Sequence, residues 1–276
     1  MRGEQLSALA TQTLGRAATV RYSPLERRFR QSTLFLTKGA LKELTPERGE
    51  QLRADGNRLL FDVVDEVVPP AIEHLPDALI ASSLTAFDAL SRQYPHIEVL
   101  LVNHHVDPRV QALAIPRGTQ PFSAGYFGEA VNAVLSPSIR SRIDVVELDT
   151  SRENAPWFDH LRGHTLHYAV RNTRELDAFK PFLKGFTAAW CWSNVLIQDS
   201  QAEAVRWLGA DYPFLVHLAA DAPPEAVERT VLAALDAARD AFGGPEWESG
   251  LDRMAGIRDR TSSRRIAREL HRVLMR

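Results

Sequence analysis

The chain has 276 residues, of which 45% are hydrophobic, 25% charged and 8% aromatic, which argues against disordered, collagen-like and coiled-coil classes. Its 33 Lys and Arg against 35 Asp and Glu give a net charge of -2, so we expect no dedicated nucleic-acid binding. One cysteine, Cys191, excludes a disulfide framework and a cysteine-built zinc site. No run approaches the ~20 apolar residues that span a bilayer, and the first residues lack the apolar core of a secretory signal. We therefore expect a cytoplasmic α/β protein.

Residues 1–15, MRGEQLSALATQTLG, look like the first helix of a doubly wound domain. The strand that should precede such a helix is absent. Either the N-terminal sheet is short by one strand, or the assignment of residues 1–15 to a helix is wrong.

Short apolar strands and helices alternate through the rest of the first half. Strands are predicted at Ala18–Tyr22, Ser32–Leu36, Arg58–Val64, Asp77–Ser82 and Ile97–Asn103. Four of the five are near-continuous apolar runs, as expected of strands buried on both faces of a parallel sheet. Helices are predicted at Lys38–Asp55 and Ser83–Tyr94, the second with Ser82 or Ser83 as its N-cap. This repetition is typical of βαβ units.

Residues 107–125 hold three prolines and two glycines without a helical period, and we predict a linker there. The α/β pattern then restarts. Further strands are predicted at Phe122–Phe127, Asp144–Leu148, Thr165–Val170, Asn194–Gln198 and Phe214–Val216. Helices are predicted at Glu129–Leu135, Pro181–Cys191, Gln201–Leu208, Pro223–Ala241, Pro245–Ala255 and Thr261–Met275. The predicted architecture is two α/β halves and a helical C-terminus.

Residues 77–107, DALIASSLTAFDALSRQYPHIEVLLVNHHVD, contain a strand ending in Ser-Ser, a helix, and a second strand ending in Val-Asn-His-His-Val-Asp. This pattern resembles the end of the N-terminal domain of GT-B-fold retaining glycosyltransferases of the large family-four group. In that group the second strand ends close to P-N-G-V-D. Asn103, Val106 and Asp107 match this ending, whereas His104 and His105 stand where the family has other residues, including the glycine.

Two later segments fit the same resemblance, which covers residues 58–218. Phe122–Asn132, FSAGYFGEAVN, resembles the first strand and glycine-bearing loop of the family's nucleotide-binding domain. Lys180–Gln198, KPFLKGFTAAWCWSNVLIQ, takes the place of its signature helix and following strand. The resemblance implies two Rossmann-like domains facing each other across a cleft. Residues 1–110 would form the acceptor-side domain and residues 111–276 the nucleotide-sugar-binding domain with its closing helices.

A family member of this kind uses a nucleotide sugar as co-substrate and needs no resident cofactor and no essential metal. Consistent with that, no D-x-D stands at a strand end, and Asp62 and Asp65 have the wrong spacing. Gly125 and Gly128 would let backbone N–H groups approach the diphosphate closely. Lysine or arginine would then neutralise the charge that develops on the leaving diphosphate.

Two departures from the family pattern concern charged residues. Gly128 is followed by Glu129, Ala130, Val131 and Asn132, so the cations that commonly hold the diphosphate are missing locally. The two signature glutamates, eight positions apart, fall at Phe179 and Thr187. Thr187 would give the donor ribose a weaker, neutral hydrogen bond in place of the second glutamate.

Lys180 and Lys184 are four residues apart, so a helix would place them on one face near its N-terminus. Cations there oppose the helix dipole, which makes sense if an anion sits between them and the exposed N–H groups; plain solvation is the alternative. Arg171, at a strand end, is a further candidate phosphate partner. Glu129 would contact a sugar hydroxyl or simply lie in the solvated first turn of a helix.

His104 and His105 are the catalytic candidates, facing the acceptor side, because they follow a strand at the edge where open α/β sheets bind ligands. Adjacent strand residues point to opposite faces, so at most one faces the cleft. The alternative is a hydrogen-bonded histidine in a linker.

The last 26 residues hold eight arginines against three acids. Ile266, Leu270, Val273 and Leu274 recur at helical spacing, with arginines around them. Such a helix can lie on an anionic membrane surface, giving peripheral association, or can dock its apolar face on the body of the protein.

We therefore expect a metal-independent, retaining glycosyltransferase that moves a hexose-like sugar from a nucleotide diphosphate donor to an acceptor not defined by the sequence, whether glycan, lipid-linked or small molecule. The main alternative is a glycosyltransferase-like scaffold or partner subunit that has lost catalysis, since both glutamates and the loop cations are missing. An epimerase of the same architecture is the weaker third reading.

Overall fold

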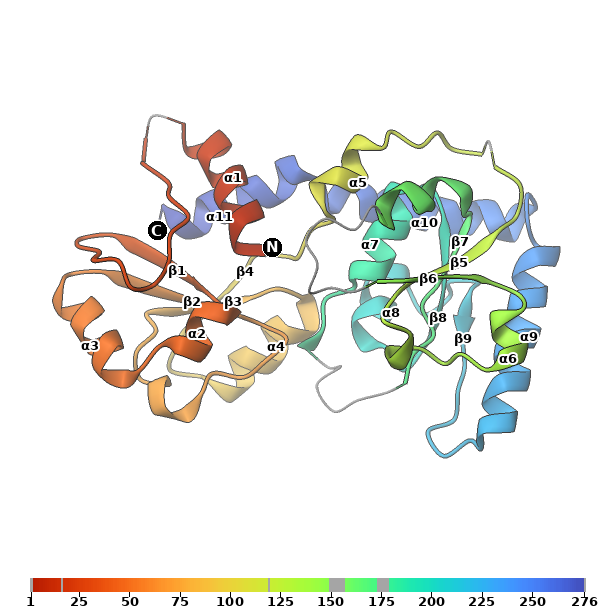
Figure 1. Ribbon diagram of the computed structural model, residues 1–276, viewed down its shortest axis with the longest axis horizontal. Coiled ribbons are helices and arrows are strands. Elements are labelled where there is room, and N and C mark those ends of the chain that lie inside the picture. The colour runs from red at the N-terminus through yellow and green to blue at the C-terminus, as the bar shows by residue number, and fades with distance from the viewer. Residues whose placement is uncertain (1, 16, 119, 149–156, 173–178, 276) are drawn as a thin grey trace. The chain divides into compact units, whose positions relative to one another are not determined.

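The computed structural model describes residues 2–15, 17–118, 120–148, 157–172 and 179–275, so Met1 of the predicted first helix lies outside it (Figure 1). The chain divides into two compact units. Unit 1 contains Met1–His105, Glu175–Pro181 and Ser262–Arg276, and unit 2 contains Val106–Arg174 and Phe182–Thr261. The last helix, which we predicted as part of the second domain, therefore belongs to unit 1. That the two units face each other across a cleft stays a prediction.

Unit 1 is built on a four-stranded parallel sheet in the order β1-β2-β3-β4. The strands are β1 (Thr33–Thr37), β2 (Arg58–Val64), β3 (Ala78–Ala81) and β4 (Glu98–Leu101). All four agree with predicted strands. Because neighbours in the sheet are also neighbours in the chain, each connection is a short helical crossover.

Helices cover both faces of this sheet. One face packs on α1 (Arg2–Leu14) and α11 (Ser263–Leu274), with Leu6, Leu60 and Leu270 in the shared core. The other face packs on α2 (Lys38–Glu43), α3 (Pro46–Ala54), the 3-10 turn η1 (Pro70–Ile72) and α4 (Leu84–Gln93), with Leu59 and Phe61 in that core. Successive residues of β2 thus enter opposite cores, which is why the strand is apolar except at Arg58 and Asp62.

The C-terminal helix α11 docks on unit 1. Its residues Ile266, Leu270 and Val273 are 0%, 2% and 5% exposed, and the arginines on its other face are exposed. The Glu269 carboxylate accepts hydrogen bonds from the backbone N–H of Asn103 at 3.2 Å and from its side-chain amide at 3.4 Å. The apolar face that we considered for membrane contact is therefore used inside the protein.

Two predictions for unit 1 are wrong. Ala18–Tyr22 is not a strand: β1 pairs on one side with β2, and no described strand pairs with its other side. The predicted helix Lys38–Asp55 is two helices, because Thr45 caps α3 by accepting from the Arg48 N–H at 3.2 Å and Pro46 takes the first helical position.

Unit 2 is built on a five-stranded parallel sheet in the order β6-β5-β7-β8-β9. The strands are β5 (Ala124–Gly128), β6 (Asp144–Glu147), β7 (Leu166–Tyr168), β8 (Asn194–Gln198) and β9 (Leu215–Val216). The helices and 3-10 turns are α5 (Pro108–Ala112), η2 (Ala130–Asn132), α6 (Pro137–Arg140), η3 (Trp157–Gly163), α7 (Leu183–Trp190), α8 (Ala202–Leu208), α9 (Pro224–Asp240) and α10 (Pro245–Arg260).

Unit 2 also corrects two predictions. The predicted linker begins with the short helix α5, which Asp107 caps by accepting from the Arg109 N–H at 2.8 Å. The predicted helix Glu129–Leu135 is only the turn η2. It ends because Ala133 forms a β-bridge with Arg171, and Ser136 starts a new capped helix, α6.

A buried ion pair holds the start of α1 against unit 1. Arg2 Nε lies 2.9 Å from Asp62 Oδ2, and the two side chains are 7% and 1% exposed. The Arg2 guanidinium also donates to the Val102 carbonyl at 2.8 Å, beyond the end of β4. Asp62 Oδ1 has no hydrogen-bond partner among the described residues. Burial raises the pKa of Asp62, and the nearby Arg2 charge opposes that rise.

Replacing Arg2 should therefore destabilise unit 1 selectively. We expect Arg2→Leu to lower the free energy of unfolding by about 3–5 kcal/mol, because it leaves the Asp62 carboxylate buried without a countercharge. The double variant Arg2→Leu/Asp62→Asn should recover part of the lost free energy of unfolding. All five tryptophans lie in unit 2, so tryptophan fluorescence monitors unit 2, whereas far-UV circular dichroism reports both units. Loss of circular dichroism signal without a change in fluorescence therefore marks unfolding of unit 1. Exposed Arg92→Leu is the control, and an equal effect of both substitutions would contradict the prediction.

Candidate functional site

The strand order of unit 2 singles out one point on its sheet. The chain passes from β5 to β6 on one side, and β7 then lies on the other side of β5. In open α/β sheets, ligands bind outside the carboxyl ends of the strands at the point where the order reverses in this way. The carboxyl ends of β5 and β7 are therefore the place to look for a site.

Lys184 brings a partly buried cation to the end of β5. It is the second residue of α7, and its Nζ donates to the Phe127 carbonyl at 2.6 Å. The same Nζ lies 4.1 Å from the centroid of the Tyr126 ring, a cation–π contact. No described carboxylate pairs with Lys184. A carbonyl and an aromatic face only partly replace the water that an ammonium loses on burial.

Gly128, the last residue of β5, is needed for this arrangement. A Cβ at Gly128 would lie 2.9 Å from Lys184 Nζ and 2.9 Å from the Tyr126 hydroxyl oxygen. The Tyr126 hydroxyl donates to the Glu129 carbonyl at 2.7 Å, which fixes the turn that follows. The glycine therefore lets the strand end approach both the ammonium and the phenol.

Arg171 follows β7 and adds a second positive charge to this end of the sheet. Gln198, at the end of β8, holds its backbone: the Arg171 N–H donates to Gln198 Oε1 at 3.0 Å, and Gln198 Nε2 donates to the Arg171 carbonyl at 2.7 Å. Burial, and in second place the charge of Arg171, lowers the pKa of Lys184 to about 8. Lys184 and Arg171 thus bring two positive charges to this end of the sheet.

One carboxylate lies beside these cations. Glu129 follows Gly128, and its Oε2 accepts from Asn132 Nδ2 at 2.8 Å. Between them Val131 is 71% exposed, an unusual value for a large apolar side chain. The turn η2 therefore presents a polar group and an apolar group next to the cations of the sheet edge.

Gly125 leaves room for the His164 ring, which packs against it. A Cβ there would lie 2.5 Å from Cδ2 of His164, whose Nε2 is 3.0 Å from Asp144 Oδ2. His167 is buried beside the Phe127 ring, with centroids 5.0 Å apart, and burial lowers its pKa to about 3. We predicted that Gly125 admits a diphosphate, but the space beside it is filled by an imidazole ring.

Lys180 lies outside the predicted helix, whereas Thr187 lies within it. Lys180 precedes Pro181, which disfavours helical backbone at the residue before it, and α7 begins only at Leu183. Lys180 belongs to unit 1 and Lys184 to unit 2, so the two lysines do not share a helical face. Thr187 lies on α7, about one turn after Lys184, and is partly exposed.

His104 and His105 follow β4 in unit 1. Their rings stack with centroids 5.6 Å apart, and His104 Nδ1 lies 3.0 Å from both the carbonyl oxygen and the backbone nitrogen of His105. His104 Nδ1 donates to the first or accepts from the second, according to its tautomer. His105 is 1% exposed, whereas His104 is partly exposed. Burial, and then the charge of Arg2, lowers the pKa of His104 well below its ordinary value. His104 is therefore neutral at pH 7.

Sequence reasoning missed Tyr126 and Gln198. Gln198 had a usable signal in the sequence, because it is a polar residue that directly follows the apolar run Val195–Ile197. In the structure it is 1% exposed, and a buried amide of this kind needs hydrogen-bond partners inside the fold. Tyr126 had none, because its ring meets Lys184 only through the packing of α7 on the sheet.

The described residues form neither a metal-ion cluster nor a membrane-spanning helix. No group of three or more His, Cys, Asp or Glu side chains among them could hold a metal ion. No helix that they form combines the length and the apolar character needed to cross a membrane.

Comparison with known proteins gives a match at the level of structure. No protein-family model matches the sequence, and no curated protein matches it. The pneumococcal O-GlcNAc transferase GtfA, solved in complex with UDP and GlcNAc, superposes with a TM-score of 0.59 at 9% identity, covering 89% of this chain and 57% of GtfA. A GtfA/B complex gives a TM-score of 0.57 at 9% identity with the same coverage. The chain thus spans little more than half the length of these proteins, and its fold is that of a GT-B glycosyltransferase.

The close approach at Gly128 gives a first test. We expect Gly128→Ala to lower the free energy of unfolding of unit 2 by about 1–3 kcal/mol, because the new methyl group displaces Lys184 Nζ or the Tyr126 hydroxyl. Gly163→Ala is the matched control, since a Cβ at Gly163 meets no atom within 4 Å. Denaturant unfolding followed by tryptophan fluorescence measures both. Equal stability of the two variants would mean that the site tolerates the added methyl group.

Burial of Lys184 also predicts a pH dependence of stability. Its pKa is about 8 in the folded protein and 10.5 as its ordinary value, so between these pH values the unfolded chain binds more protons. The free energy of unfolding should therefore rise with pH over this window, by roughly 3 kcal/mol in total. Lys184→Met should lack the rise, and Lys42→Met, at an exposed lysine, should keep it. A rise of the same size in Lys184→Met would show that another group is responsible.

Proposed function

We propose that the protein transfers a sugar from a nucleotide diphosphate sugar, and that the donor diphosphate binds at the carboxyl ends of β5 and β7. The observation that carries this proposal is the partly buried ammonium of Lys184, which has no carboxylate partner among the described residues and lies where the strand order reverses. A diphosphate would supply the missing countercharge. The GT-B fold supports the same reading, because GtfA, which shares it, was solved with UDP and GlcNAc.

Each residue of the site has a role in this proposal. Lys184 and Arg171 neutralise the diphosphate, and Gly128 keeps the strand end open to it. Glu129 accepts a hydroxyl hydrogen bond from the sugar, and Thr187 lies near the ribose. Val131 offers an apolar surface to the donor. Lys180 and Gly125 are not assigned a donor contact, since one belongs to unit 1 and the other packs against His164.

The reaction breaks the bond between the sugar C1 and the β-phosphate oxygen and forms a bond from C1 to an acceptor oxygen. The negative charge that develops on the leaving diphosphate is stabilised by Lys184 and Arg171, so no metal is required for that step. The acceptor hydroxyl gives up its proton, and the proposed recipient is Nε2 of the neutral His104 imidazole, in the tautomer whose Nδ1–H donates to the His105 carbonyl at 3.0 Å. His105 supports this imidazole by stacking. Retention at C1 stays a prediction from the family resemblance.

A second candidate function is that of a catalytically inactive scaffold. Phe179, at the position of one signature glutamate, packs against the core of unit 1, and its carbonyl accepts from the Ser83 hydroxyl at 3.1 Å. Phe179 thus contributes to the packing of unit 1. Loss of this acid favours a protein that binds the donor or a partner without transferring sugar.

Calorimetric titration with UDP, UDP-GlcNAc and the corresponding GDP and TDP compounds tests the proposal. We expect at least one donor to bind, and Lys184→Met to weaken binding about 10- to 100-fold, because it removes a charge-assisted contact. Lys42→Met should bind normally. Binding by the parent protein should also weaken as pH rises above about 8, since Lys184 must be protonated to hold the anion.

The outcomes separate the candidates. Donor binding with release of the nucleoside diphosphate supports the enzyme, and donor binding without release supports the scaffold. Failure of all three nucleotide series to bind would remove the donor site, and with it the proposed function.

A further inference from the structure

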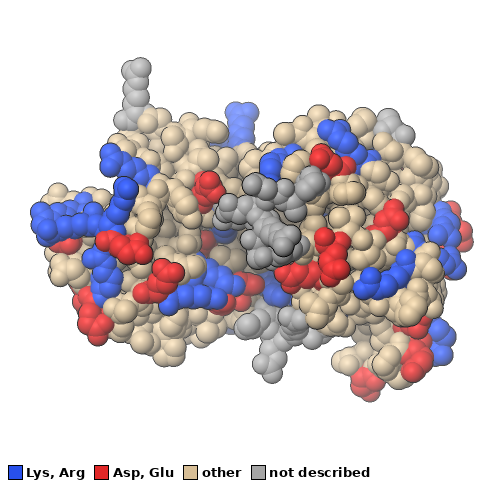
Figure 2. Space-filling view, viewed as in Figure 1, with Lys and Arg blue, Asp and Glu red and all other residues tan. Residues whose placement is uncertain are grey.

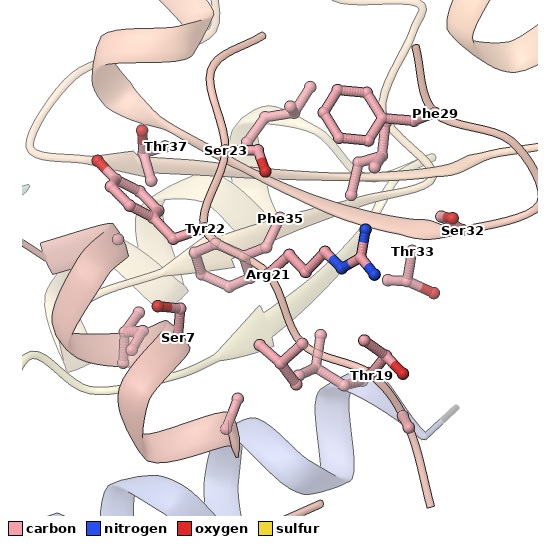
Figure 3. A pocket seen from close by; sticks show the side chains of 18 of the residues that line it. Ser7, Thr19, Arg21, Tyr22, Ser23, Phe29, Ser32, Thr33, Phe35 and Thr37 are labelled. Carbon is pink, nitrogen blue, oxygen red and sulfur yellow. The ribbon is translucent and has the colours of Figure 1, made fainter. Parts of the chain in front are cut away.

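Unit 1 contains a pocket of about 410 Å³ that the proposed glycosyl transfer does not use (Figure 3). Its walls are α1, the segment 18–25 that follows α1, strand β1 and the end of α11. A volume of this size lies in the range of small-molecule sites, about 300–1,000 Å³. All the lining residues belong to unit 1, so the pocket is a property of that unit alone.

The lining is mainly apolar. Leu6 and Leu14 come from α1, Phe35 from β1 and Leu274 from α11. Tyr22 and Met275 also line the pocket, although they are 61% and 54% exposed. Large apolar side chains left in water at the mouth of an apolar pocket mark a place where a ligand covers them.

The mouth carries positive charge. The Arg21 side chain extends across the pocket towards Ser32 and Thr33 (Figure 3), and no described residue pairs with it. Arg27, Arg28 and Arg30 follow this segment without lining the pocket, and basic side chains lie beside acidic ones at this end of unit 1 (Figure 2).

Little negative charge compensates these arginines. Arg28 and Arg30 share one carboxylate, Asp55, at 3.7 and 3.8 Å, and both guanidinium groups are more than 60% exposed. Exposed pairs of this length contribute little. The mouth of the pocket therefore favours an anion, and the interior favours an apolar chain.

An extended peptide is the competing occupant, because the free side of β1 could pair with a strand. The segment through Tyr22 and Ser23 crosses β1 instead of running along it (Figure 3). A peptide strand that followed β1 would meet this crossing segment. A flexible chain that lies against α1, segment 18–25 and the end of α11 does not need that edge.

We propose that this pocket binds an anionic single-chain amphiphile, with its alkyl chain among α1, β1 and α11 and its anionic head at Arg21. The site is independent of the proposed function, since it uses no residue of the sheet edge in unit 2. Lipids with a phosphate or carboxylate head have this chemistry.

Calorimetry with a series of alkyl phosphates, each below its micelle concentration, tests the proposal. Burying one methylene contributes about 0.8 kcal/mol, so each two-carbon extension from butyl to dodecyl phosphate should tighten binding about 15-fold until the pocket is full. Inorganic phosphate alone should not bind measurably. An alkyl maltoside of the same chain length should bind at least 10-fold more weakly than the phosphate.

Two variants locate the site. Thr33→Trp, at an exposed position of the lining, should fill the pocket and weaken dodecyl phosphate binding at least 10-fold. Arg21→Glu should weaken the phosphate series and leave the maltoside unchanged. Arg229→Glu, an exposed change of the same charge in unit 2, is the control, and circular dichroism confirms that each variant folds.

Three results would overturn the proposal. They are absence of saturable binding, binding without chain-length dependence, and binding that neither variant alters. Protection of the β1 amides from hydrogen exchange by an added extended peptide, without alkyl phosphate binding, would assign the pocket to a strand. Attachment to anionic vesicles without binding of the free amphiphile would mean that the arginines contact a membrane surface and the pocket stays empty.

Discussion

The fold depends on one constraint, which is that both parallel sheets are buried on both faces. Leu59, Leu60 and Phe61 in β2 are each 0% exposed although they alternate between two cores. A strand buried in this way carries mostly apolar side chains along its length. Asp62 in β2 and His167 in β7 are buried polar exceptions within strands, and the other polar groups of the two sites lie near strand ends, where the backbone leaves the sheet.

The two units use buried cations at those ends in different ways. In unit 1 Arg2 meets a carboxylate, Asp62, and two backbone carbonyls, so the charge is internally compensated and ties α1 to the sheet. In unit 2 Lys184 meets a carbonyl and an aromatic ring and no described carboxylate. The first arrangement is complete without a ligand. The second is electrostatically open, which is the physical basis for placing the donor there.

Much of the fold could be predicted because strands buried on both faces leave a strong signal: the ranges of β2 and β8 match their predictions residue for residue. Ala18–Tyr22 has the composition of a strand, but no described strand pairs with it. The composition of a segment does not show whether a pairing strand is available. For the site, the family resemblance indicated Gly128 and Glu129, a strand end indicated Arg171, and helical spacing indicated Lys184; these residues lie at one edge of the unit 2 sheet. Lys180 was assigned to the helix because the effect of Pro181 on the residue before it was overlooked. Contacts such as Tyr126 with Lys184 depend on tertiary packing and leave no pattern in one sequence.

The return of α11 to unit 1 has a consequence for biosynthesis. One covering layer of the first sheet is supplied by residues made after the whole of unit 2. During translation the ribosome therefore releases a complete unit 2 while Leu60 and Ile80 still lack part of their cover. Until the last helix emerges and packs, one apolar face of the first sheet stays partly uncovered and accessible to chaperones.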